Sequence, residues 1–244
     1  MKDVIIANFK MNKTFSETKE YVKELSSLVD NSASKIYLCL PYTSLYISKL
    51  YKGKLFKFGA QNVHEEEYGA YTGEISAQML KDLKIELVIV GHSERRKMGE
   101  SNDVINKKIK TALRFGLEVV LCVGETRAQK NTNKTEFAIK KELSEALSGI
   151  YENELNNITI AYEPVWAVGT GKIADFKDIL AAVETIRAFI AQLYSKDAAK
   201  NIKVVYGGSV DSQNAKQIIK SKNINGVMLG GTSLDPNNFA KLLK

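Results

Sequence analysis

Short apolar runs rich in β-branched residues alternate with helix-like segments eight times along this chain of 244 residues. The apolar runs are, in order, VIIANF, KIYLCL, LFKFGA, ELVIVG, LEVVLCVG, ITIAYE, IKVVYG and GVMLGG. The helices that follow them are expected at 16–29, 43–50, 76–83, 102–114, 134–148, 175–194, 211–220 and 232–243. Strands alternating with helices favour a parallel sheet covered by helices, and eight units are the number that closes a (β/α)8 barrel. We therefore expect an α/β fold with eight parallel strands, each followed by a helix.

The length and charge of the chain narrow its class further. Barrels of this kind run to roughly 200–250 residues as one unit, so residues 1–244 are expected to form a single domain of the TIM-barrel type. The formal net charge is +7. Because the lysines are scattered along helical segments, without a basic block that carries interleaved aromatic residues, the charge is interpreted first as a solvated surface, with attraction of a small phosphate or carboxylate as the alternative, and no nucleic-acid partner is expected.

Cysteine usage and hydropathy indicate the cellular compartment of the protein. Cys39 and Cys122 each lie inside an apolar run and are expected to be reduced and buried, which favours a cytoplasmic protein over a secreted one. The apolar run at the N-terminus is too short for a signal peptide, and no stretch reaches the roughly 18 apolar residues of a membrane span. The two histidines are far apart and no cysteine pair has ligand spacing, so no metal is expected.

Functional side chains are expected at the carboxyl ends of the strands, because barrel enzymes carry their sites there. Side chains alternate between the two faces of a strand, so each strand has one row that faces the barrel axis. The inward rows are predicted as Thr159, Ala161 and Glu163; Ile6, Asn8 and Lys10; and Val88, Val90 and His92. Three strands thus deliver Lys10, His92 and Glu163 to one mouth of the barrel.

These three side chains are the parts needed to remove a proton beside a carbonyl group. Glu163 can act as the base, His92 as an electrophile and Lys10 as a fixed cation. A helical turn that begins at Ser93 would direct backbone N–H groups toward His92 and disfavour its protonated form. Each residue alone is more often solvated or structural, and the hypothesis depends on their convergence.

Two glycine pairs complete the predicted site. YGGSV follows the seventh strand and LGGTS follows the eighth, and both lead directly into helices. Glycine lets backbone N–H groups approach a ligand closely, and these two loops of a barrel frequently bind phosphate. One such pair could be no more than a tight turn, but two pairs at these positions favour a phosphate site.

The chain resembles the triosephosphate isomerase family from end to end. The matching stretches are ANFKMN, GAYTGEIS, GHSERR, LCVGET, AYEPVWAVGTGK, YGGSV and GVMLGG, which occur in the family's order across all eight units. The resemblance implies interconversion of D-glyceraldehyde 3-phosphate and dihydroxyacetone phosphate through an enediol(ate), in glycolysis and gluconeogenesis. It implies neither a metal nor an organic cofactor.

The resemblance also assigns roles at the site. It makes Glu163 the base that moves the proton between two carbons, and neutral His92 the hydrogen-bond donor to the substrate oxygens. Lys10 supplies positive charge, Asn8 a further polar contact, and Glu94 a carboxylate near the lysine. The residues whose backbone N–H groups are implied to bind phosphate are Gly169, Ser209, Gly230 and Gly231.

Two loops carry further implications of the resemblance. PVWAVGTGK, from Pro164 onward, resembles a mobile lid with a hinge at each end. The long loop NVHEEEYGAYTGE resembles the segment that docks beside the catalytic lysine of a second subunit, with Thr72 at its tip, so a homodimer is expected. His64 in this loop is expected at the surface or in an interface, without a catalytic role.

Two alternatives compete with this interpretation. Another phosphate-binding barrel, such as a sugar-phosphate isomerase or a lyase of amino-acid biosynthesis, would share the glycine loops but not Lys10, His92, Glu163 and the lid together. A basic nucleic-acid-binding domain would bind nucleic acid in a strongly salt-dependent way.

Overall fold

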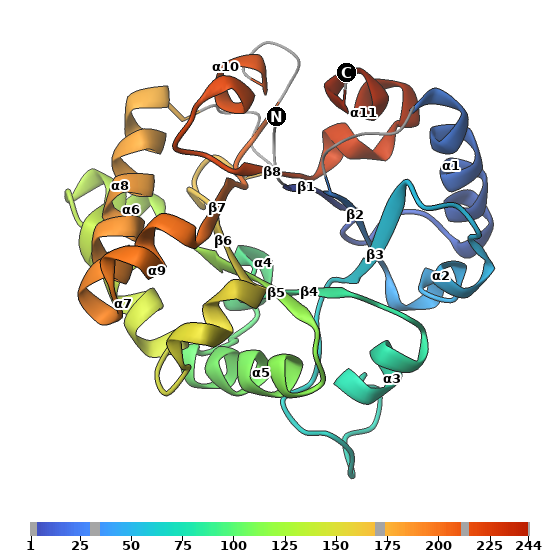
Figure 1. The fold of residues 1–244 in the computed structure, drawn as a ribbon, viewed down its shortest axis with the longest axis horizontal. Coiled ribbons are helices and arrows are strands. Elements are labelled where there is room, and N and C mark those ends of the chain that lie inside the picture. Colours follow the sequence, from blue (N-terminus) through green and yellow to red (C-terminus); the bar gives the residue numbers. More distant parts are fainter. Residues whose placement is uncertain (1–3, 30–34, 169–173, 211–214, 244) are drawn as a thin grey trace.

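The computed structural model describes residues 4–29, 35–168, 174–210 and 215–243, and these form a closed barrel of parallel strands surrounded by helices (Figure 1). The strands pair in sequence order, and β8 returns to pair with β1. They are β1 (Val4–Asn8), β2 (Lys35–Leu40), β3 (Phe56–Ala60), β4 (Leu87–Val90), β5 (Glu118–Val123), β6 (Ile158–Tyr162), β7 (Lys203–Tyr206) and β8 (Gly226–Leu229). The predicted TIM-barrel fold is confirmed.

Helices follow the strands and cover the outside of the barrel (Figure 1). They are α1 (Phe15–Leu28), α2 (Ile47–Leu50), α3 (Ala77–Asp82), α4 (Ser93–Lys97), α5 (Asn102–Arg114), α6 (Arg127–Asn131), α7 (Thr135–Ala146), α8 (Phe176–Leu193), α9 (Lys196–Asn201), α10 (Ala215–Lys220) and α11 (Pro236–Leu243). Three short 3-10 turns are η1 (Tyr42–Ser44), η2 (Glu152–Asn157) and η3 (Gly231–Leu234).

The helix ends differ from the prediction in several places. Segment 43–50 is a 3-10 turn followed by the short α2, and segment 232–243 is η3 followed by α11. Pro236 takes the first position of α11, where its missing N–H leaves no hydrogen bond unmade. The first residues of the predicted helix 211–220 lie outside the described chain. The sequence pattern did not predict α6 and α9. These helices have 5 and 6 residues, which is too short for a helical period of apolar residues to be recognised.

Buried apolar residues form two layers. One fills the barrel interior and consists of Val4, Ile6, Tyr37, Cys39, Leu87, Ile89, Val120, Cys122, Ala161, Val205 and Met228. The other lies between the strands and the helices and takes the opposite row of each strand. Cys39 and Cys122 are buried free thiols, as predicted. The interior is therefore a packed core, and a ligand can reach only its open end.

Helix α8 shows how the sequence places a helix on this barrel. Asp175 caps its start, accepting the backbone N–H of Lys177 at 3.0 Å. Its buried residues recur every three or four positions, on one face of the helix: Ile179, Ala182, Val183, Ile186 and Ile190. Burying each of the larger side chains stabilises the fold by roughly 1.5–3 kcal/mol.

One predicted strand row is wrong. In β4, Leu87 and Ile89 face the barrel interior, whereas Val88 and Val90 lie in the outer layer. Continued alternation would therefore turn His92 outward. Gly91 has a φ of +71°, in the left-handed region that favours glycine, and this interrupts the alternation before His92. His92 thus reaches the cavity by a backbone turn and not by the strand row that predicted it.

The long loop between β3 and α3 extends away from the barrel (Figure 1). Its base is closed by a hydrogen bond from the His64 N–H to the Ile75 carbonyl at 2.9 Å. Thr72 and Tyr68 are exposed. His64 is partly buried, since 13% of its side chain is exposed and its ring lies 4.3 Å from the ring of Tyr71.

A buried ion pair lies beneath this loop. The carboxylate of Glu100 binds Lys108, and only 4% of each side chain is exposed. Arg95 donates to the same carboxylate at 3.0 Å, and Lys108 also donates to Asn62 at 2.9 Å. Burial alone would raise the pKa of Glu100, but Lys108 and Arg95 outweigh this and hold the pKa below its usual value. The pair therefore ties Glu100 to α5, and the bond from Lys108 to Asn62 joins α5 to the start of the long loop.

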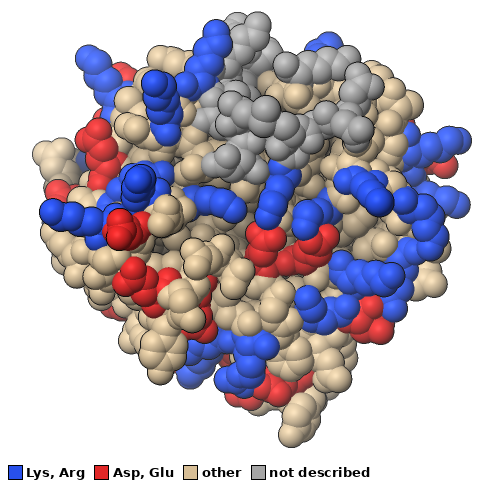
Figure 2. All heavy atoms as spheres, viewed as in Figure 1, with Lys and Arg blue, Asp and Glu red and all other residues tan. Residues whose placement is uncertain are grey.

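Surface charge is mixed. Figure 2 shows basic side chains distributed over the visible face, with acidic side chains between them. Mixed charges of this kind differ from the continuous basic stripe that tracks a nucleic-acid backbone. Within the described residues, no helix combines the length and apolar character that crossing a membrane requires.

Candidate active site

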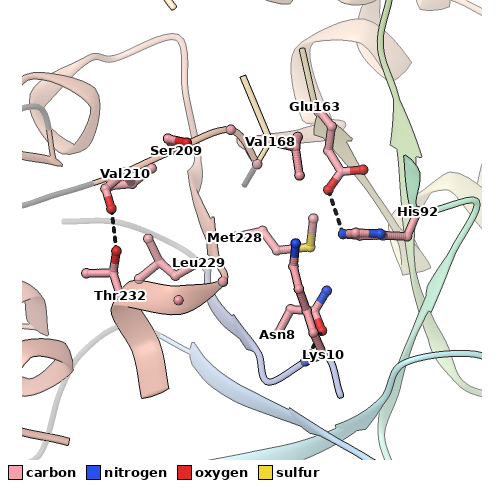
Figure 3. Close-up of a pocket in the computed structure, with 14 residues that line it drawn as sticks. Asn8, Lys10, His92, Glu163, Val168, Ser209, Val210, Met228, Leu229 and Thr232 are labelled. Carbon is pink, nitrogen blue, oxygen red and sulfur yellow. Dashed lines mark hydrogen bonds and ion pairs between the residues drawn. The ribbon is translucent and has the colours of Figure 1, made fainter. Parts of the chain in front are cut away.

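A cavity of about 310 Å³ opens at the carboxyl ends of the strands. Its lining comes from β1, β4, β6, β7 and β8 and the loops that follow them (Figure 3). The residues are Asn8, Lys10, His92, Glu163, Val168, Gly207, Gly208, Ser209, Val210, Met228, Leu229, Gly230, Gly231 and Thr232. Lys10, His92 and Glu163, predicted from separate strands, therefore line one cavity.

Glu163 and His92 are in direct contact. The Oε1 atom of Glu163 lies 3.1 Å from Nε2 of His92, and its Oε2 atom accepts the backbone N–H of Ser93 at 3.1 Å (Figure 3). Glu163 is 2% exposed and His92 is 5% exposed. A carboxylate held in so dry a site keeps few water partners, so its charge is balanced by the protein groups around it.

The start of α4 determines which ring nitrogen of His92 carries the proton. Helix α4 begins at Ser93, as the sequence predicted, and His92 is its N-cap. Nδ1 of His92 accepts the backbone N–H of Glu94 at 3.2 Å. An accepting nitrogen carries no proton, so Nε2 holds the proton and the ring in this arrangement is neutral. Its Nε2 atom is the ring atom that contacts Glu163, and Oε1 of Glu163 has no hydrogen-bond partner of good geometry among the described residues.

The two groups shift each other's pKa in opposite directions. Burial alone would raise the pKa of Glu163, but His92 and the Ser93 N–H outweigh burial and hold this pKa below its usual value. Burial alone would lower the pKa of His92, but the Glu163 and Glu94 carboxylates outweigh it and raise the pKa, against the expectation that the helix start disfavours the protonated form. The neutral ring follows from the Glu94 N–H bond to Nδ1 and not from the direction of this shift. Glu163 is therefore ionised at neutral pH and available as a base.

Lys10 is held in place by hydrogen bonds to its backbone and by an ion pair of its side chain. Its φ of +51° is unusual for a residue with a side chain. Asn8 Oδ1 accepts the Lys10 N–H at 3.0 Å, and Gln61 donates to the Lys10 carbonyl at 2.9 Å. The ammonium group lies 2.8 Å from Glu94 Oε1, so Glu94 is near the lysine as expected. Strain of this kind is typical of functional sites, where the surrounding structure maintains it.

The two glycine-rich loops lie on the opposite side of the cavity from Glu163 and His92 (Figure 3). Ser209, Gly230 and Gly231 all contribute to the lining, as expected. The hydroxyl of Thr232 donates to the Val210 carbonyl at 2.6 Å and so joins the two loops. Gly169, the fourth residue expected to bind phosphate, lies outside the described residues, as do residues 170–172 at the end of the predicted lid.

Several lining residues escaped the sequence analysis. Met228 belongs to the interior row of β8 and lies at the floor of the cavity. A Cβ atom on Gly207 would lie 2.9 Å from Glu163 Cγ and 3.1 Å from Met228 Cε, so only glycine fits beside the carboxylate. The period-two pattern of β8 would have found Met228. Nothing local to the sequence indicates that Gln61 touches the functional residues. Gly207 belongs to the predicted glycine pair of YGGSV, but its contact with Glu163 was not predicted.

The segment after β6 is held by a cluster of aromatic and charged side chains. Glu125 is fully buried, and its Oε1 accepts the indole N–H of Trp166 at 2.7 Å. The hydroxyl of Tyr162 donates to the same carboxylate at 3.1 Å. Arg127 lies over the Trp166 ring, 4.7 Å from its centroid. Trp166 therefore anchors the chain three residues beyond Glu163.

The site has the chemical parts for one class of reaction. A buried carboxylate, a neutral imidazole and an ammonium group face a cavity whose other side is glycine-rich backbone, and the described residues contain no group of three His, Cys, Asp or Glu side chains able to hold a metal ion. Fold and site together define an enzyme of the (β/α)8-barrel class that transfers protons on a small anionic substrate.

Comparison with known proteins identifies the family. The model of the triosephosphate isomerase family matches residues 3–244. The triosephosphate isomerase of Dictyoglomus thermophilum is 44% identical over 246 residues, which cover 100% of this chain and 99% of that protein. That of Aquifex aeolicus is 46% identical over 246 residues, with the same coverage. The chain belongs to the triosephosphate isomerase family, and its activity is the isomerisation of triose phosphates in glycolysis.

Proposed function

We propose that Glu163, His92 and Lys10 catalyse the interconversion of D-glyceraldehyde 3-phosphate and dihydroxyacetone phosphate, with residues 1–244 acting as one catalytic domain. The contact between a buried carboxylate and the Nε2–H of a neutral imidazole, at 3.1 Å, is the observation that carries the proposal. Both groups then face the carbon and the oxygen that react when a substrate lies in the cavity.

The reaction needs one proton carrier and one donor to oxygen. Glu163 removes a proton from the carbon beside the carbonyl, and His92 donates its Nε2–H hydrogen bond to the oxygen on which negative charge develops. Glu163 then returns the proton to the neighbouring carbon, and the proton of the substrate hydroxyl passes to the former carbonyl oxygen, so the former carbonyl becomes a hydroxyl and the former hydroxyl a carbonyl. The carboxylate ends as it began, and no external oxidant or metal enters the balance.

Lys10 and the glycine loops hold the substrate. The ammonium group of Lys10 attracts the negatively charged substrate and stabilises the enediolate, while Asn8 supplies a polar contact and fixes the Lys10 backbone. The backbone N–H groups of Ser209, Gly230 and Gly231, and of Gly169, are proposed to bind the phosphate. Because no charge of the phosphate changes in the reaction, this binding orients the substrate without taking part in proton transfer.

We also propose a cytoplasmic homodimer. A second cavity, of about 220 Å³, adjoins the catalytic one and shares Asn8, Lys10 and His92 with it. Its rim includes Met11 and Met98, which are 97% and 80% exposed. Exposed methionines around a polar cavity favour burial against another surface, and the protruding loop that carries Thr72 is the proposed occupant, from a second copy.

A coupled assay with glyceraldehyde 3-phosphate tests the proposal. The parent chain is expected to isomerise it, and Glu163→Gln and His92→Gln are each expected to lower kcat by at least about 10²-fold. Glu136→Gln, on the exposed face of α7, serves as a matched control and should leave kcat unchanged. Full activity of Glu163→Gln would contradict the assignment of the base.

A further inference from the structure

Glu142 is a mostly buried carboxylate for which the proposed mechanism has no role. It lies in α7, outside the barrel, and only 18% of its side chain is exposed. Its Oε2 atom accepts the backbone N–H of Gly124 at 2.9 Å. Burial raises the pKa of Glu142, while Arg96 and the Gly124 N–H oppose this. Burying a carboxylate costs desolvation free energy, so we expect Glu142 to have a role at this position.

Gly124 lies directly against the backbone of Glu163. A Cβ atom on Gly124 would lie only 1.9 Å from the Glu163 carbonyl oxygen. On either side of this contact, Glu163 N–H donates to the Val123 carbonyl at 2.8 Å and Val165 N–H donates to the Glu125 carbonyl at 3.1 Å. The backbone of residues 123–125 is therefore the surface that sets the position of residues 163–165.

Arg96 connects Glu142 to the other half of the site. Its Nη1 atom lies 3.8 Å from Glu142 Oε1. Its Nε donates to the Gly91 carbonyl at 2.8 Å, and its Nη2 donates to the Cys122 carbonyl at 3.1 Å. Gly91 directly precedes His92. Glu142 and Arg96 together thus hold the backbone segments that lead to His92 and that support Glu163.

We propose that Glu142 is a positioning residue for Glu163, acting from the outer helix layer through the Gly124 N–H. The proposal rests on the proposed role of Glu163 as the base. The carboxylate of Glu142 touches neither the cavity nor the substrate, and its effect passes through one hydrogen bond and one backbone contact. Displacing a catalytic group by about 1 Å can lower the rate on the order of 10²-fold, so a small relaxation of Gly124 is enough to be measured.

Charge and hydrogen bonding at Glu142 can be separated. The charged groups that face Glu142 are Arg96, which attracts it, and Glu163 and Glu125, which repel it. Glu142→Gln removes the charge but keeps an oxygen that can accept the Gly124 N–H. Glu142→Leu has a similar size and removes the acceptor. Glu142→Asp keeps the charge and withdraws the acceptor by one methylene.

The experiment measures kcat and KM for glyceraldehyde 3-phosphate in these three variants. Glu142→Leu and Glu142→Asp are expected to lower kcat by roughly 10- to 100-fold with KM within about twofold of the parent, and Glu142→Gln is expected to stay within about threefold. Glu136→Gln and Glu136→Leu, at an exposed position of the same helix, are the matched controls and should match the parent. Rates are compared per folded molecule, from circular dichroism.

A second measurement follows the hydrogen bond itself. The Gly124 amide is expected to exchange slowly with solvent deuterium in the parent and in Glu142→Gln, and at least about tenfold faster in Glu142→Leu. Slow exchange with unchanged kcat in Glu142→Leu would overturn the proposal, as would a Glu142→Gln variant as slow in turnover as Glu142→Leu. If Glu142→Leu does not fold, Glu142→Asp decides by the same criteria. Failure of the base assignment is recognised separately, by an active Glu163→Gln.

Discussion

Replacing Gly124 by alanine tests how closely catalysis depends on the backbone beneath Glu163. The added Cβ would meet the Glu163 carbonyl oxygen at 1.9 Å, and such atoms are essentially never found closer than 3.0 Å. The two backbones must therefore separate by about 1 Å, because neither atom belongs to a flexible side chain. A displacement of that size at the base is expected to lower kcat on the order of 10²-fold.

Gly226 offers a matched control at the other end of the barrel. A Cβ there would lie 1.7 Å from the Val4 carbonyl oxygen, where β8 and β1 begin their pairing. Both substitutions overpack a backbone contact and are expected to cost about 1–3 kcal/mol of unfolding free energy. Thermal unfolding should thus show a lower Tm for both variants, by roughly 2–4 °C per kcal/mol for a chain of this size.

The assay compares kcat and KM of the two variants well below their Tm. Gly124→Ala is expected to lose kcat with little change in KM, whereas Gly226→Ala should keep the parental kcat per folded molecule. An equal loss of kcat in both variants would show that overpacking anywhere in the barrel disturbs catalysis. A parental kcat in Gly124→Ala would show that Glu163 does not depend on this contact.

Three further outcomes follow from the structure. Glu163→Asp withdraws the carboxylate by one methylene and should lower kcat on the order of 10²-fold while an inert phosphate ester still binds, which steady-state inhibition kinetics would reveal. Lys108 and Arg95 hold the pKa of Glu100 below its usual 4.5, so the ion pair stabilises the fold above pH 4.5 and this stabilisation is lost as the pH falls through the folded pKa. Glu100→Gln should therefore lower the free energy of unfolding by about 3 kcal/mol at pH 7 and by less at pH 4, and an equal loss at both pH values would refute this prediction. Thr72→Arg should convert the proposed dimer into a folded monomer of low activity, measured by light scattering beside the isomerase assay; a parent chain that is monomeric yet fully active would oppose this.

The period of the sequence predicted the barrel well because the strands are buried on both faces and the longer helices on one. Inward rows followed the pattern in β1 and β6, where Ile6 and Ala161 lie in the barrel interior. The inward row of β4 did not follow the prediction. All four residues of β4 are leucine, valine or isoleucine, so the sequence does not show which alternate pair faces the barrel interior. His92 nevertheless reaches the cavity, because the left-handed turn at Gly91 reverses the parity that the predicted row had wrong.

The supporting contacts of the site could not be read from the sequence. Gln61 fixes the Lys10 carbonyl from 51 positions away, and Glu125 binds Trp166 from 41 positions away. Such contacts depend on which loops the closed barrel brings together, and the composition of each loop does not reveal them. The left-handed backbone conformation of Lys10 could not be predicted from the sequence either, because no glycine or asparagine stands at that position.

The chain contains a single tryptophan, so all of its indole fluorescence comes from one place. Trp166 lies three residues beyond Glu163, with its ring N–H on the buried Glu125 carboxylate at 2.7 Å and the Arg127 guanidinium 4.7 Å above its centre. An indole between an anion and a cation has an emission wavelength that responds to small changes in either. The protein therefore carries a built-in optical reporter beside its catalytic carboxylate, and ligand binding can be followed in stopped-flow without any added dye.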